Sequence, residues 1–186
     1  VFGIVSVKDK LQISDSLVET SALAKVDLKA LGAKTSFEHM TRLQGPDGSI
    51  YLAIGLGDEE LNDEQFRQLA GAAVRNLGDI EKVVIGLPTN SSSASLAVIE
   101  GALLAHYEFT EYKSVKKTRK LTDLTVLARE VPLPAQIDEA QTVVEAINLV
   151  RDMVNTAPND LYPQTFAALM QKAARGKGVT VDVWDE

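Results

Sequence analysis

The sequence predicts an α/β fold, in which helices cover a mixed, mostly parallel sheet to form a three-layer sandwich. Two observations lead to this class: strand-like segments alternate with helical segments along most of the chain, and one hairpin interrupts the alternation. With 45% hydrophobic and 24% charged residues, the composition is that of a globular protein. The 186 residues are enough for one domain and a short part of a second.

The first half of the chain supplies the hairpin and the clearest capping signal. The turn residues Pro46-Asp47-Gly48 separate two β-prone runs, which predicts an antiparallel pair. Asn62 and Gln65 have the spacing of a capping box at the start of an amphipathic helix, and Gly78 ends that helix. The predicted elements are a strand at Val1–Val7, a ragged helix at Ser16–Gly32, strands at Phe37–Leu43 and Ile50–Leu56, and a helix at Asn62–Leu77.

The second half alternates strands with helices. Val83, Val84 and Ile85 are consecutive and apolar, which predicts a strand covered on both faces. Either Ser92 or Ser93 can cap the helix that follows. The predicted elements are a strand at Lys82–Leu87, a helix at Ala94–His106, a strand at Leu121–Ala128, a helix at Asp138–Asn155, a helix from Pro163 that Gly176 and Gly178 end, and a strand at Val179–Trp184.

Two closely spaced prolines, Pro132 and Pro134, mark the best candidate domain boundary, because proline stiffens a linker and cannot donate to a sheet. We expect an N-terminal α/β domain at 1–134, a long connecting helix at 135–157, and the start of a second domain at 158–186. Ala140, Val144 and Ile147 lie on one apolar face of the connecting helix. The chain opens without Met inside a predicted strand, which suggests a trimmed or processed start.

Composition excludes several classes of function. The chain has no cysteine, so it forms no disulfide and no Cys-based zinc or iron–sulfur site, as expected in a reducing compartment. No apolar run approaches the roughly 20 residues of a membrane-spanning helix, and no signal peptide opens the chain. The net charge of −7 disfavours nucleic acid as a partner. One basic segment, Lys113–Lys120, is interpreted as a solvated loop or a local anion or subunit contact.

Few residues suggest chemistry by themselves. His39 and His106 are far apart in sequence and are interpreted as surface or capping residues. Gly55-Leu56-Gly57 lies where a phosphate-binding loop would lie, but it lacks a third glycine and precedes Glu59 and Glu60, so we interpret it as a turn leaving a strand. The polar loop Gly86–Ser93 precedes a helix and is interpreted as a serine cap rather than an anion site. Glu100 is a carboxylate inside an apolar helix, where we expect it to be paired.

Three landmarks in a fixed order resemble the leucyl aminopeptidase (cytosol aminopeptidase) family. The segment Val150–Pro163 resembles the R-D-x-V-N-x-x-P-N-x-L-x-P stretch between the two domains of that family, although Ala157 stands where many members have proline. Glu100–Leu104 with Tyr107, Phe109 and Tyr112-Lys113-Ser114 resembles its E-G-x-x-L…Y-x-F-x-x-Y-K-S signature, and Leu52–Gly57 resembles the strand ending in G-L-G. The resemblance covers about Leu31 to Glu186.

The resemblance implies that the chemistry lies outside this chain. The family holds two divalent metal ions, Mn or Zn, in the motifs G-K-G-[IV]-x-F-D-[ST]-G-G and N-T-D-A-E-G-R-L, and neither motif is present. Gly176–Asp182 begins like the first motif but continues with Val183-Trp184, and Asn155-Thr156 begins like the second but continues with Ala157-Pro158. No catalytic, cofactor-binding or metal-binding residue is therefore expected here. In the full-length enzyme, one metal would polarise the scissile carbonyl for attack by a bridging water.

By resemblance, the chain is expected to be a macro-domain-like N-terminal part of a cytoplasmic, hexameric peptidase. It would pack against its own catalytic domain, regulate or assemble the enzyme, and meet the peptide substrate only through that missing domain. Two alternatives remain at this point. One is a free-standing module that binds a nucleotide-like or anionic small molecule through Gly55–Gly57 and Thr89–Ser93. The other is nucleic-acid binding through Lys113–Lys120, against which the net charge counts.

Overall fold

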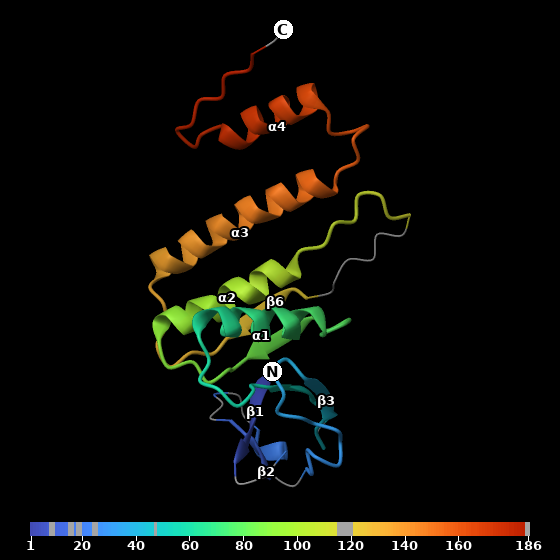
Figure 1. The fold of residues 1–186 in the computed structure, drawn as a ribbon, viewed down its shortest axis with the longest axis vertical. Helices are drawn as coiled ribbons and strands as arrows, with labels where there is room; N and C mark the ends of the chain where they lie inside the picture. Colours follow the sequence, from blue (N-terminus) through green and yellow to red (C-terminus); the bar gives the residue numbers. More distant parts are fainter. Residues whose placement is uncertain are drawn as a thin grey trace. The chain divides into compact units, whose positions relative to one another are not determined.

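The computed structural model describes residues 1–7, 10–14, 17, 20–23, 26–46, 48–114 and 121–184. The chain forms two compact units, Val1–Glu145 and Ala146–Glu186. Six strands and the first two α-helices belong to the first unit, in agreement with the predicted α/β class (Figure 1). The strands are β1 (Phe2–Val7), β2 (Lys10–Ile13), β3 (Met40–Gln44), β4 (Ile50–Gly55), β5 (Lys82–Ile85) and β6 (Asp123–Val126).

Strand β1 lies at the centre of the sheet, although it comes first in the sequence. It pairs in parallel with β4, through Phe2 and Ala53, and its carboxyl-terminal half pairs antiparallel with β2. Its other partner is β5: Phe2 forms a parallel bridge with Gly86, and the Gly86 amide donates to the Val1 carbonyl at 3.1 Å. These bonds join β5 and its parallel neighbour β6 to the rest of the sheet. Strands β4, β1, β5 and β6 are therefore parallel to one another while β2 and β3 are antiparallel, so the sheet is mixed, as predicted.

The hairpin between β3 and β4 confirms the prediction from the turn residues. The two strands pair antiparallel from Met40 opposite Ile54 to Gln44 opposite Ile50. The Gly45 amide donates to the Ser49 carbonyl at 2.8 Å, and Gly48 has a positive φ of 82°. Since few residues other than glycine adopt this conformation without strain, Gly48 closes the turn.

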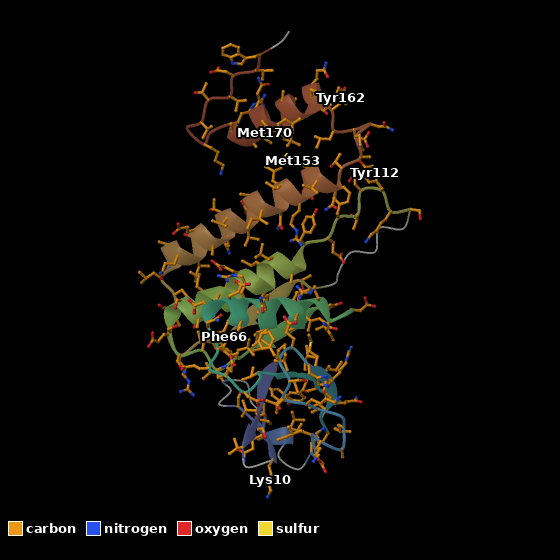
Figure 2. The ribbon with its side chains drawn as sticks, in the orientation of Figure 1. Lys10, Phe66, Tyr112, Met153, Tyr162 and Met170 are labelled. Carbon is orange, nitrogen blue, oxygen red and sulfur yellow. The ribbon has the colours of Figure 1, made fainter. Side chains whose placement is uncertain are left out.

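A hydrophobic cluster covers each face of the sheet. On one face, Ile54 and Ile85 pack with α1 (Asp63–Arg75) and α2 (Ser92–His106), and Figure 2 shows Phe66 on the side of α1 that faces the strands. On the other face, Phe2 and Ile4 pack with residues of the segment that follows β2. That second cluster comprises Phe2, Ile4, Leu23, Leu28, Ala33, Leu43 and Ala53. The alternation of neighbouring residues between clusters follows from the two-residue period of a strand.

The covering of the second face corrects the prediction of a helix at Ser16–Gly32. The described part of this segment holds only the 3₁₀ turn η1 (Ser21–Leu23) and a further turn that ends at Gly32. Asp27 caps that second turn, because its carboxylate accepts from the Lys29 and Ala30 amides at 3.0 and 3.1 Å. Leu23 and Leu28 are nevertheless buried in the core. The apolar residues that suggested a helix therefore cover the sheet from short turns instead.

Helices α1 and α2 pack closely on each other. The predicted capping box is present: Asn62 Oδ1 accepts from the Gln65 amide at 2.9 Å, and Gln65 Oε1 accepts from the Asn62 amide at 3.0 Å. Helix α2 is capped by Ser91, whose hydroxyl accepts from the Ala94 amide at 3.1 Å, and not by Ser92 or Ser93 as predicted. A β-carbon added to Gly101 would lie 2.1 Å from the Arg67 carbonyl oxygen, so the absence of a side chain permits the approach of α2 to α1.

Two further differences concern β5 and the end of the chain. The β5 residue Val84 is 42% exposed while Val83 and Ile85 are buried, so the strand is covered on one face only. Residues 179–184 form no strand, and Trp184 is 91% exposed. A strand needs a pairing partner for its backbone groups, and none of the described residues offers one there.

Helix α3 (Pro134–Asn155) spans the division between the two units and begins four residues before the predicted start. Pro134 is its first residue, where a missing N–H costs nothing, so this proline opens the helix instead of breaking the chain. In the second unit, α4 (Pro163–Ala174) begins at Pro163 as predicted, and Gly176 has a positive φ of 71° just after its end. Helix α4 has no buried residue.

Candidate functional site

A crevice lies where three parallel strands end. It has a volume of about 850 Å³ and is lined by the end of β1, by residues that follow β2, β4 and β5, and by the first turns of α1 and α2. Its apolar floor includes Val5, Leu56 and Phe66. In parallel sheets, the crevice at the carboxyl ends of the strands is the usual place for a ligand, because loops and helix amino termini converge there. This position makes it the candidate site of the first unit.

The charge of the crevice disfavours anions. Its described lining contains the carboxylates of Asp58, Glu59, Glu60 and Asp63 and contains no basic side chain. Asp63 lies in the first turn of α1, where a negative charge is stabilised by the helix dipole. A phosphate or a nucleotide entering the crevice would meet four negative charges and no compensating cation from the described lining. The electrostatics therefore argue against the nucleotide-like ligand considered from the sequence.

The hydroxyl groups around the crevice are mostly used by the protein itself. Ser91 caps α2, and its Oγ lies 3.0 Å from Ser93 Oγ. Ser95 is buried and donates to Thr89 Oγ1 at 3.1 Å, and it also lies 3.0 Å from the Ser91 carbonyl. The polar loop 86–93 is therefore a serine cap, as interpreted from the sequence. Ser14 Oγ, which is buried beside the crevice, has no hydrogen-bond partner among the described residues.

The G-L-G segment forms a structural turn, in agreement with the sequence interpretation. A β-carbon on Gly55 would lie 2.2 Å from the Ser36 carbonyl oxygen, so this glycine lets the chain at 34–36 cross the end of β4. Gly57 has a φ of 81° and its amide donates to the Thr35 carbonyl at 2.8 Å. The backbone therefore requires glycine at both positions. This requirement accounts for the G-L-G motif without a bound phosphate.

Glu100 is paired, as expected. Arg67 donates to Glu100 Oε2 from Nε at 2.9 Å and from Nη2 at 2.6 Å, and its Nη1 contacts Glu64. The hydrogen bonds that Arg67 donates to Glu100 raise the pKa of the Arg67 guanidinium above its ordinary value. The Glu100-Gly101 dipeptide of the family signature thus serves structure twice: the carboxylate bridges α2 to α1, and the glycine allows their close contact.

The two histidines do not form a site together. Half-buried His39 precedes β3, and its Nε2 lies 3.2 Å from the Gly32 carbonyl oxygen. His106 is exposed at the last turn of α2. Among the described residues, no three His, Cys, Asp or Glu side chains are close enough together to hold a metal ion.

The basic segment falls largely outside the described residues. Of its charged residues, only Lys113 is described: it is exposed, and its amide donates to the Thr110 carbonyl at 3.1 Å. The neighbouring signature residues Phe109 and Tyr112 pack ring against ring with centroids 5.7 Å apart. Lys116, Lys117, Arg119 and Lys120 lie outside the described residues.

The two segments that imitate catalytic motifs have ordinary structural roles. Gly176-Lys177-Gly178 forms the turn after α4, with positive φ at both glycines. Asn155 ends α3, and the Thr156 hydroxyl donates to the Asp152 carbonyl at 2.7 Å. Across the part of the chain that the structure describes, no helix combines the length and the apolar character that crossing a membrane requires.

Solved structures with the same fold include a maturation enzyme and a leucine aminopeptidase. The bottromycin maturation enzyme BotP superposes with a TM-score of 0.70 at 26% identity, over 87% of this chain and 36% of that one. A mutant of tomato leucine aminopeptidase superposes with a TM-score of 0.70 at 22% identity, over 79% of this chain and 31% of that one, which shows the shared fold.

Curated relatives from several bacteria share the name "Probable cytosol aminopeptidase". A "Probable cytosol aminopeptidase" of Leifsonia xyli is 38% identical over 163 residues, which are 86% of this chain and 33% of the relative. Its counterpart in Micrococcus luteus is 36% identical over 191 residues, with 94% and 37% covered. The chain thus spans about a third of the length of these relatives. Residues 6–116 match the model of the cytosol aminopeptidase family, N-terminal domain. The chain therefore belongs to the cytosol aminopeptidase family and contains its N-terminal domain.

Proposed function

We propose that this chain is the N-terminal assembly and regulatory part of an aminopeptidase that removes N-terminal residues from peptides. Its relatives are named as cytosol aminopeptidases and are about three times as long as the matched segment. The catalytic residues would lie in the part that this chain does not contain. Within the chain, we propose an N-terminal domain at 1–134, a connecting helix at 135–157 and the first residues of the catalytic domain at 158–186.

The observation that carries this proposal is the uncovered apolar surface of α3 and of the second unit. Val150 and Val154 on α3 are 52% and 79% exposed, and Trp184 is 91% exposed. Helix α4 buries nothing, although Phe166 and Leu169 are among its residues. Exposed apolar surface of this extent is typical of an interface. The partner that fits is the remainder of the same polypeptide, because the curated relatives continue over about twice this length again.

The metal ions of the proposed enzyme would also be bound outside this chain. A solved relative is described as BotP in complex with Mn, at 27% identity and a TM-score of 0.68. Two divalent ions, Mn or Zn, that lie about 3.5–4 Å apart need several converging carboxylates. The described residues provide no such cluster. The chain's own contribution would be to hold the catalytic domain, and no reaction step is assigned to its side chains.

Assembly and location follow the same proposal. We expect the full-length protein to form a homohexamer in the cytoplasm and to contact peptide substrate only through its catalytic domain. The names of the curated relatives support the location. The acidic net charge of −7 and the acidic crevice argue against nucleic acid and nucleotides as partners.

The first test compares this chain with the full-length protein from the same gene. Hydrolysis of leucine p-nitroanilide is measured with Mn²⁺ or Zn²⁺ added after removal of bound metal. We expect turnover from the full-length protein only, lost with a chelator and restored by metal. Metal-stimulated turnover by the 186-residue chain would contradict the assignment of catalysis to the missing part.

A second test addresses the uncovered surface. Val154→Asp is introduced on the exposed apolar face of α3, and Gln141→Asp, on the same helix, is the matched control because Gln141 is exposed and polar. In the isolated chain, both variants should unfold within about 0.5 kcal/mol of the parent. In the full-length protein, only Val154→Asp should lower the unfolding temperature and the activity, since it buries a charge in the interface. Equal behaviour of the two variants there would show that this face remains in solvent.

A further inference from the structure

The crevice at the ends of β1, β4 and β5 contains a polar group that the described residues leave without a partner. Ser14 lines the crevice and is only 9% exposed. Its Oγ has no hydrogen-bond partner among the described residues. A buried hydroxyl that has lost its hydrogen bonds to water needs another partner, and a bound molecule can supply one.

The backbone places Ser14 on the helix-covered face of the sheet. Its amide donates to the Gly3 carbonyl at 2.9 Å, so Ser14 lies beside β1 just after the last rung of β2. A β-carbon on Gly3 would lie 2.7 Å from Ser14 Oγ and 2.6 Å from Leu56 Cδ1. Val1 and Val5 share that face of β1, and they pack in the cluster beneath α1 and α2. The hydroxyl is therefore next to Leu56, on the apolar floor of the crevice.

The negative charges of the crevice come from the other side of β1. All four carboxylates lie in the exposed segment 58–63 that follows β4, whereas Ser14 follows β2. Because β1 lies between β2 and β4, the two strands that lead to these groups are about 10 Å apart. The floor between them includes Val5 and Leu56. A ligand that reaches both groups is therefore elongated, apolar in its middle and positively charged.

We propose that this crevice binds a linear aliphatic diamine. One ammonium group donates to Ser14 Oγ, the methylene chain lies over the apolar floor, and the second ammonium group faces the carboxylates of the segment 58–63. A volume of about 850 Å³ is in the range of small-molecule sites. Since lining residues such as Ser6 and Asn90 are exposed, water reaches the crevice, and N–H groups without a protein partner stay hydrated.

Other cations and amines match the crevice less well. Among the described residues, no three acidic or histidine side chains come close enough to hold a metal ion. A free amino acid brings a carboxylate that the acidic lining repels. The inference does not depend on the proposed function, because every lining residue belongs to the first unit.

Calorimetric titration of the 186-residue chain with cadaverine tests the proposal. Pentylamine keeps the apolar stem and one ammonium group, and glutarate has a similar length with the opposite charge. Cadaverine should bind with a Kd below about 1 mM, and pentylamine at least about tenfold more weakly, since it lacks one charged hydrogen bond. Glutarate should give no heat. The affinity for cadaverine should fall as salt is added, because the exposed carboxylates are then screened.

Matched variants assign the binding to the crevice. Ser14→Ala removes the hydroxyl without a change in charge and should weaken cadaverine binding about tenfold. Its unfolding temperature should not fall, because the hydroxyl has no described partner to lose. Glu59→Gln with Glu60→Gln should also weaken binding about tenfold. The control, Glu139→Gln with Glu145→Gln, changes the net charge equally at exposed positions of α3 outside the crevice, and should leave the affinity within about twofold.

Four results would overturn the proposal. The first is the absence of binding heat with cadaverine, and the second is an unchanged affinity in Ser14→Ala. The third is an equal loss from the two double variants, which would show attraction by net charge alone. The fourth is binding of Nα-acetyl-lysine amide as tight as that of cadaverine, because the occupant would then be a lysine side chain of another protein and not a free diamine.

Discussion

The close contact between α1 and α2 provides the most direct test of the packing described above. Gly101 of α2 faces the backbone of Arg67 on α1, and a β-carbon there would lie 2.1, 2.8 and 2.9 Å from the Arg67 carbonyl oxygen, carbonyl carbon and Cα. Real β-carbons essentially never approach other atoms within 3.0 Å. The obstacle is backbone, so no side-chain rotation can relieve it. The Gly101→Ala change therefore requires the two helices to move apart.

The expected cost combines two opposed effects. Overpacking of a well-packed contact costs about 1–3 kcal/mol, and a backbone obstacle favours the upper end of that range. Replacing glycine by alanine inside a helix stabilises the folded state by about 1 kcal/mol, because alanine has the higher helix propensity. We therefore expect Gly101→Ala to lower the free energy of unfolding by about 2 kcal/mol, which corresponds to a fall of about 4–8 °C in Tm for a chain of this size.

The control is the same substitution on the opposite helix. A β-carbon on Gly71 would lie 3.2 Å from Arg75 Nη1, which can move away, and 3.3 Å from the Gly101 carbonyl oxygen. Gly71→Ala should therefore be neutral within about 0.5 kcal/mol or stabilising, because propensity outweighs the small contact cost. Urea or thermal unfolding followed by circular dichroism measures both. The reasoning is refuted if Gly101→Ala unfolds like the parent, or if the two variants lose equal stability.

Three further changes test electrostatics and capping. In a chain that begins at Val1, the pKa of about 6 for the Val1 amino group in the folded state lies below the ordinary 8.0, so the folded state binds fewer protons than the unfolded state. Its stability should therefore rise by about 2 kcal/mol from pH 6 to pH 8, and N-terminal acetylation should abolish this slope in pH-dependent urea unfolding. Glu100→Gln should lower the free energy of unfolding by about 1–2 kcal/mol, since it weakens a half-buried ion pair with Arg67. Glu64→Gln, which weakens the more exposed ion pair of the same arginine, should cost less than about 0.5 kcal/mol. Equal losses would contradict the reasoning that the more buried ion pair contributes more. Asn62→Ala should cost about 1 kcal/mol by removing the cap of α1, and an unchanged Tm would contradict the observed capping box.

Local signals in the sequence identified the elements whose causes are local. The capping box of α1, the turn between β3 and β4, and the proline that opens α4 all depend on residues within one or two turns of the chain. Their chemistry is therefore visible in the order of residues. Pro134 shows the limit of the same rule, because a proline that can break a chain can also begin a helix, and only the surrounding structure decides which.

Elements that depend on distant partners could not be predicted in this way. Residues 179–184 have strand-like composition but no described partner, and the apolar residues after β2 reach the core without a helix. The exposure of Val84 follows from its face of β5, which the sequence of that strand alone does not reveal. The crevice likewise depends on β1, β4 and β5 ending together, so its shape and acidic lining emerge only once the sheet is assembled.

The central place of β1 has a consequence for synthesis of the protein. Residues 2–7 are made before their parallel partners, because β4 begins at residue 50 and β5 at residue 82. At about 5–20 residues per second, a ribosome needs several seconds to extend the chain from β1 to β5. Until β4 is made, the nascent β1 has only the antiparallel partner β2, and its apolar residues Phe2 and Ile4 lack part of their final cover, which includes Ala53. Until β4 and β5 leave the ribosome, the emerging chain therefore exposes apolar surface of the kind that chaperones bind.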